Sequence, residues 1–256
     1  MTRSQSTLLR QAVLVVILLN VAFNYIYDKL PGAVSIAEVS RSYHDLFTPA
    51  GYVFAIWGII YLSFIIYGIV QLRRANREVA YFDSLGVPLL LVNVLGSAWI
   101  VVFTQGCMAL SVVIIVATLL LGLRQFLLAN ASVNGGASRW LLVPFSLFFG
   151  WISVAVIANI TVLLVSVGWS GFGLAASTWV TALIAVAAVL GGVIGANFKN
   201  FIYPAVISWA LTGIGYARRA DFPEVAKIAC IWAGILALMV VALLVRSFKH
   251  TPTSRS

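Results

Sequence analysis

An uncharged, apolar run from Thr48 to Leu72 limits the folds that this chain can adopt. A helix rises about 1.5 Å per residue, so about 20 apolar residues cross the hydrocarbon core of a bilayer, and this run is long enough. Similar runs recur along the 256 residues, of which 62% are hydrophobic and 9% charged. A soluble domain carries about 25% charged residues. The sequence therefore predicts a polytopic membrane protein.

The length of the apolar runs also decides the type of secondary structure. Backbone polar groups in lipid must be satisfied within a helix or a closed barrel, and these runs are too long and too uniformly apolar for barrel strands. We therefore expect an all-α, polytopic transmembrane helical bundle of about eight helices, forming a single membrane domain over residues 1–256. The expected spans are approximately 12–27, 49–72, 86–104, 108–128, 140–166, 175–196, 201–217 and 224–245.

Prolines stand near the start of several expected spans, where a missing N–H costs little. Pro49 is expected in the first turn of the second span and Pro88 near the start of the third. This placement puts Trp57 two turns inside the helix, deeper than the interfacial belt of membrane tryptophans, where its N–H requires a protein or ligand partner. Trp57 and Tyr61 are four residues apart and are expected to stack on one face.

The basic residues predict an orientation in the membrane. Eight spans place both termini on one side, and with that side cytoplasmic most of the 16 Lys and Arg residues fall in cytoplasmic segments. The loop that holds Arg218 and Arg219 favours the opposite orientation. We expect an integral, multi-pass protein of a bacterial inner membrane with both termini cytoplasmic. The net charge of +9 then reflects orientation, and we expect no nucleic-acid partner.

The sequence lacks the usual chemistry of membrane enzymes and coupled transporters. No ionisable residue lies deep in an expected span, which argues against ion coupling through buried carboxylates. The two histidines, His44 in a loop and His250 in the tail, exclude a bis-histidine haem in the bundle. The chain has no zinc spacing, Walker motif or nucleophile elbow. We expect no metal site, no catalytic residue and no enzyme activity.

Aromatic and amide side chains inside the spans are the remaining candidates for a binding site. Indole and phenol rings supply stacking surface for a flat apolar ligand, and N–H groups and amides fix its orientation. The same side chains can instead pack helix against helix, and Asn20, Asn24 and Asn93 fit interhelical hydrogen bonds equally well. The candidate ligand-binding residues are Trp57, Tyr61, Trp99, Trp151, Asn159 and Asn24.

Gly191 and Gly195 form a G-x-x-x-G pair in the sixth span, which predicts close helix packing within one chain or between subunits. This pair and the three C-terminal spans keep a structural or assembly role in a larger membrane complex as an alternative function. A facilitative transporter for small solutes is a further alternative, and it predicts an internal repeat between the two halves of the chain.

Two stretches resemble the translocator protein family, also called the tryptophan-rich sensory protein (TspO/MBR) family. The run from Pro49 to Tyr61, PAGYVFAIWGIIY, is similar to the helix 2 signature of that family. The run from Trp151 to Asn159, WISVAVIAN, is similar to its helix 5, in which a Trp precedes an Asn by eight. Thr48, Gly51 and Ala55 stand where the family has Pro, Trp and Pro.

The resemblance implies a five-helix core at 10–166, with a three-helix extension at 167–247 and a basic tail at 248–256. It implies a receptor, sensor or carrier that binds a tetrapyrrole, sterol or carotenoid in a pocket among helices 1–5. Residues 28–48 would then form a lid over one end of the pocket. A porphyrin is an expected ligand, and its degradation is the one enzyme activity that the resemblance leaves open. No cofactor is required, and the expected partners are the lipid bilayer, the hydrophobic ligand and a second copy in a homodimer.

Overall fold

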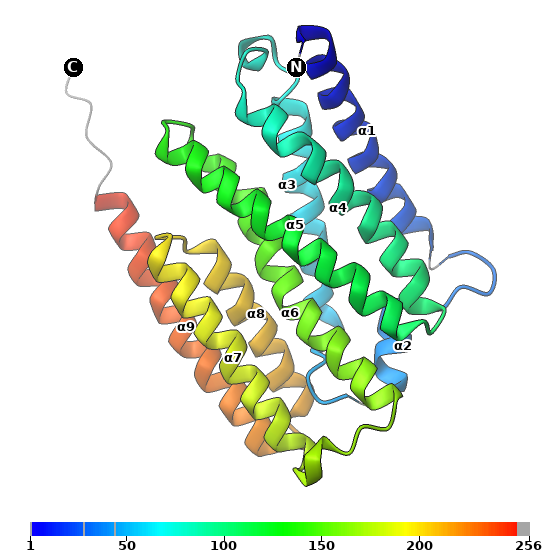
Figure 1. The fold of residues 1–256 in the computed structure, drawn as a ribbon. Coiled ribbons are helices and arrows are strands. Elements are labelled where there is room, and N and C mark those ends of the chain that lie inside the picture. The colour runs from blue at the N-terminus through cyan, green and yellow to red at the C-terminus, as the bar shows by residue number, and fades with distance from the viewer. Residues whose placement is uncertain (1, 28, 44, 250–256) are drawn as a thin grey trace. The chain divides into compact units, whose positions relative to one another are not determined.

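The computed structural model describes residues 2–27, 29–43 and 45–249, and these residues form helices joined by short connections, with no strand (Figure 1). Asp28, His44 and most of the expected basic tail, 250–256, lie outside the described residues. The eight long helices are α1 (Arg3–Tyr27), α3 (Ile56–Val70), α4 (Tyr81–Thr104), α5 (Met108–Asn134), α6 (Leu142–Ser166), α7 (Ala176–Asn197), α8 (Ile202–Arg218) and α9 (Pro223–Lys249). Seven candidate spans are long and apolar enough to cross a membrane, and one of them, Gly51–Val70, combines a 3-10 turn with the 15 residues of α3. The remaining long helix, α8, has 17 residues and is not among these spans. The prediction of a polytopic helical bundle is confirmed.

The chain divides into two compact units. The described residues of Met1–Asp45 and Phe54–Trp169 form one unit, called here the five-helix unit. Leu46–Val53 and the described residues of Ser170–Ser256 form the other, called here the C-terminal unit. A short segment from the first third of the sequence therefore belongs with the last three helices.

The five-helix unit is a closed ring. Each of its long helices packs mainly against two others, in the cyclic order α1, α4, α5, α6, α3 and back to α1. The short helix α2 (Ile36–Ser42) covers one end of this ring, beside the turn between α4 and α5 (Figure 1). Its Val39 is buried against Phe103, Met108 and Val162, which belong to α4, α5 and α6.

The C-terminal unit packs α7, α8 and α9 against one another. Gly191 and Gly195 of α7 are buried in this packing. A Cβ on Gly191 would lie 3.2 Å from Leu236 of α9, and a Cβ on Gly195 would lie 3.0 Å from Pro204 of α8. Of the two predicted uses of the glycine pair, the structure therefore assigns packing within one chain.

The helix that contains Trp57 starts later than predicted. Pro49 precedes the helix, Gly51–Ala55 form a 3-10 turn, and α3 begins at Ile56, so Trp57 lies in its first α-helical turn and not two turns inside. The physical reason is a competing partner, because the Val53 carbonyl, which is the α-helical acceptor for the N–H of Trp57, accepts a hydrogen bond from the Trp209 indole N–H at 3.0 Å.

Other helices also begin or end at residues that differ from the predicted ones, because charged or turn-prone residues do not end these helices. α4 begins at Tyr81, which places Pro88 in the second helical turn and not near the start. α5 continues to Asn134 through much of the predicted 129–139 loop. α1 begins at Arg3 and includes Arg10, which lies outside the expected span 12–27.

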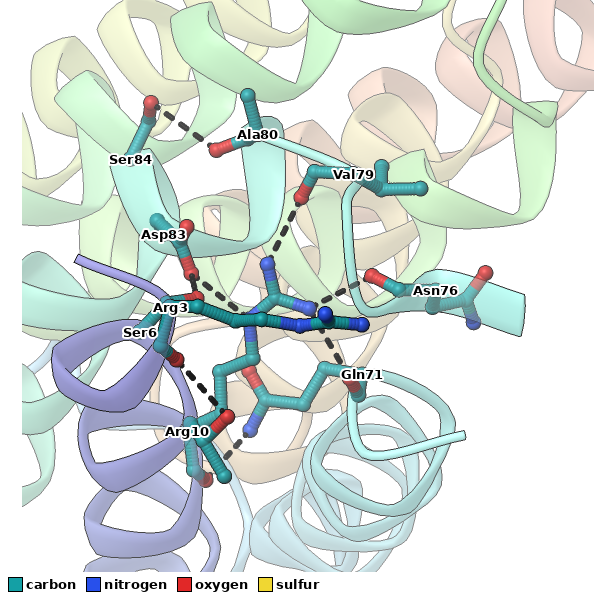
Figure 2. Close-up of polar contacts among 10 residues, drawn as sticks. Arg3, Ser6, Arg10, Gln71, Asn76, Val79, Ala80, Asp83 and Ser84 are labelled. Atoms are coloured by element: carbon teal, nitrogen blue, oxygen red, sulfur yellow. Dashed lines mark hydrogen bonds and ion pairs between the residues drawn. The ribbon is translucent and has the colours of Figure 1, made fainter. Parts of the chain in front are cut away.

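Arg10 is buried because its charge is fully neutralised and hydrogen bonded (Figure 2). Its Nε donates to the Asp83 carboxylate at 2.7 Å, and the Ser6 hydroxyl donates to the same oxygen at 2.6 Å. Its Nη1 donates to the carbonyls of Gln71 and Asn76, and its Nη2 donates to the carbonyl of Val79. The side chain therefore joins α1 to α4 and to the connection between α3 and α4.

An amide cluster joins α1 to α4 inside the span. The Asn20 amide donates to Asn93 Oδ1 at 2.9 Å, and Asn20 Oδ1 accepts hydrogen bonds from Ser97 and Asn24 at 2.7 and 2.9 Å. Of the two roles left open for Asn20 and Asn93, the geometry assigns the interhelical hydrogen bond.

Replacing Asn20 by Leu should lower the free energy of unfolding by about 1–2 kcal/mol, since interhelical hydrogen bonds in membranes contribute about 0.6–1.7 kcal/mol each. The measurement is a denaturation titration in mixed micelles. Asn134→Leu, at the exposed end of α5, is the matched control and should change the midpoint little. Equal midpoints for the two variants would contradict a stabilising role for the cluster.

Candidate functional site

An aromatic cluster between the neighbouring helices α3 and α6 contains three of the six predicted site residues. Trp57 and Tyr61 stack with ring centroids 5.2 Å apart and an interplanar angle of 24°, which confirms the prediction from their spacing. Trp151 meets the Trp57 ring edge-on at 6.3 Å. Phe54 and Phe148 extend the cluster, at 5.6 Å from Trp151 and 6.5 Å from Trp57.

The N–H and O–H groups of this cluster have no hydrogen-bond partner among the described residues. Among the described residues, the indole N–H groups of Trp57 and Trp151 and the hydroxyl of Tyr61 form no hydrogen bond. Trp57 and Tyr61 are partly exposed, while Trp151 is buried. None of these three donor atoms is among the buried unpaired polar atoms of the described residues, so the donors are accessible at the surface of the cluster. There they can donate to a ligand that carries acceptor groups.

Trp99 and Asn159 form a second group, whose polar atoms are paired. The Trp99 indole N–H donates to Asn159 Oδ1 at 2.7 Å, and the Asn159 amide donates to Ser111 Oγ at 2.9 Å. The three residues join α4, α6 and α5. Trp99 also stacks on Phe103, with centroids 4.8 Å apart. Sequence reasoning did not identify Ser111, because one small hydroxyl in an apolar span carries no distinctive signal.

Asn24 lies apart from the aromatic cluster. Its amide donates to the carbonyl oxygen and to Oδ1 of Asn20, one turn earlier in α1, at 2.8 and 2.9 Å. The structure thus separates the six candidates into the α3–α6 aromatic cluster, the Trp99–Asn159 pair and Asn24 in the amide cluster.

Part of the predicted lid, from Ile36 to Tyr43, packs over one end of the ring. Ile36 and Tyr43 pack with Trp99 and Leu163 around the Val39 contact. After α2, the Asp45 carboxylate accepts a hydrogen bond from the Thr161 hydroxyl of α6 at 2.9 Å. Sequence reasoning also missed Thr161, whose partner lies 116 residues earlier in the chain. The lid segment is therefore fixed to the helices that carry Trp99 and Asn159.

The ring of long apolar helices, its short covering helix and its neutral aromatic cluster define an integral, multi-pass helical membrane protein. A family model described as TSPO-like protein matches residues 10–242, and the chain belongs to this family. The match continues past residue 166 and includes α7, α8 and most of α9. No curated protein and no solved structure matches the chain significantly. Family membership indicates a membrane-bound sensor or binding protein.

Proposed function

We propose that this protein is a membrane receptor, sensor or carrier for a flat hydrophobic ligand that carries a few hydrogen-bond acceptors, such as a tetrapyrrole. The observation that carries the proposal is the Trp57–Tyr61–Trp151 cluster with its unpaired N–H and O–H donors. Indole and phenol faces stack on a flat ring system, and the donors fix its orientation.

The surroundings of the cluster favour ligand binding over catalysis. Its members are neutral, so they favour an apolar ligand, and none is paired with a general base. The lid helix α2 covers one end of the same ring of helices, which suits a binding site that excludes water. We therefore propose no catalytic residue and no resident cofactor.

The test is a titration of the purified protein with protoporphyrin, followed by the Soret absorbance of the ligand. We expect saturable binding by the wild type. In Trp57→Ala/Trp151→Ala the Kd should rise at least about fivefold, because each lost aromatic contact is worth about 0.5–1.5 kcal/mol. Trp57→Phe keeps a ring but removes the N–H, so a smaller loss in this variant separates stacking from hydrogen bonding.

Trp232→Phe, in α9 of the C-terminal unit, is the control for a general effect of removing an indole. Porphyrin binding that does not saturate, or a Kd that is the same in the wild type and in the double variant, would overturn the proposal. In that case the aromatic residues serve helix packing, and the assembly role remains.

A further inference from the structure

Leu46–Val53, called here the latch, is held by two hydrogen bonds to α8 within the C-terminal unit. The N–H of Ala50 donates to the carbonyl of Gly213 at 3.1 Å. The indole N–H of Trp209 donates to the carbonyl of Val53 at 3.0 Å. These bonds satisfy a backbone donor and a backbone acceptor of the latch, which in an apolar environment need partners.

Gly213 allows the latch to approach α8 closely. A Cβ at this position would overlap the Val53 Cγ2 methyl and lie 3.2 Å from the Pro49 Cβ. A glycine in a helix interior is destabilising by about 0.5–1 kcal/mol relative to alanine. The contact with the latch gives a specific reason for a glycine here, because a Cβ would require Val53 and Pro49 of the latch to move.

Aromatic contacts add to the attachment. The Tyr52 ring meets Trp209 edge-on at 5.4 Å and Tyr216 edge-on at 5.7 Å. The Arg219 guanidinium lies 3.6 Å from the centroid of Tyr216. Edge-to-face aromatic pairs and cation–π contacts favour one defined position of the latch over a mobile loop.

The residues on both sides of the latch belong to the five-helix unit. Asp45, immediately before it, accepts the hydrogen bond from Thr161, and Phe54, immediately after it, packs against Trp151. The latch is therefore the covalent connection between the part of the lid segment that ends at Asp45 and the segment from Phe54 to Trp57, in which α3 begins. The position of the latch therefore affects the position of the lid and of the first residues of α3.

We infer that Trp209 and Gly213 are positioning residues for the proposed ligand site, acting through the latch on the lid and on the first turn of α3. The inference rests on the proposed function. The C-terminal unit thus contributes to ligand affinity because it holds the latch, and the latch positions the lid and Trp57. A site that is competent in about one tenth of the molecules shows a Kd about tenfold higher.

The experiment compares Gly213→Ala and Trp209→Phe with the wild type, all as full chains in detergent. Gly213→Ala introduces the overlap with Val53, and Trp209→Phe keeps a ring while removing the bond to the Val53 carbonyl. Gly234→Ala is the matched control, because a Cβ at this α9 position meets nothing within 4 Å. Two readouts are taken, hydrogen exchange over residues 36–57 and the Kd for protoporphyrin.

We expect faster exchange in the latch and a Kd raised about tenfold in Gly213→Ala, a smaller change in Trp209→Phe, and no change in Gly234→Ala. Faster exchange with an unchanged Kd in both variants would overturn the inference while leaving the proposed function intact. Unchanged exchange and an unchanged Kd would also overturn it. A wild type that binds no porphyrin would overturn the proposed function and this inference together.

Discussion

Replacing Arg10 by Met is expected to lower the free energy of unfolding by about 3–5 kcal/mol, the usual cost of removing one partner from a buried ion pair. The Arg10 side chain is 3% exposed and bonds to Asp83 and to three backbone carbonyls. Methionine keeps an apolar stem but leaves the Asp83 charge and the carbonyls without these donors. A denaturation titration in mixed micelles measures the loss.

Arg3→Met is the matched control on the same helix. Arg3 pairs with Glu78 at 3.7 Å, and their side chains are 74% and 86% exposed, so removing the pair should cost about 0–1 kcal/mol. Equal losses for Arg10→Met and Arg3→Met would contradict a structural role for the buried guanidinium.

The buried Arg10 shows why sequence patterns predict the existence of a membrane span better than they predict the residues at which its helix begins and ends. Hydropathy and the rise of a helix are enough to predict the bundle. A charged residue beside an apolar run normally indicates the end of a span, and on that ground Arg10 falls outside the expected span 12–27. Its partner Asp83 lies 73 residues away, and only the fold brings the two side chains together.

In the candidate site too, contacts between residues close in sequence could be predicted, and contacts between residues far apart in sequence could not. The Trp57–Tyr61 stack follows from a spacing of four residues in a helix. The hydrogen bond between Trp99 and Asn159 spans 60 residues, and the bond between Trp209 and Val53 spans 156. No periodicity encodes such pairs. The late start of α3 follows from the same cause, because the partner of the Val53 carbonyl is contributed by α8.

Replacing Gly195 by Ile should lower the free energy of unfolding by about 1–3 kcal/mol, the usual cost of overpacking a well-filled interface. The new Cβ would lie 2.9 Å from the Met239 Cε, 3.0 Å from the Pro204 Cγ and 3.4 Å from the Asn200 carbonyl oxygen. The flexible Met239 can move, but the Pro204 ring and the backbone cannot move without separating α7 from α8.

Gly192→Ile, on the same helix, is the matched control because a Cβ there meets nothing within 4 Å. Micelle titrations measure stability, and light scattering of the detergent-solubilised protein measures the oligomeric state. Packing within the chain predicts a stability loss in Gly195→Ile alone, with the same mass for both variants. A change of mass in Gly195→Ile without a loss of stability would instead assign the glycine pair to a subunit interface, and a homodimer would then form through α7.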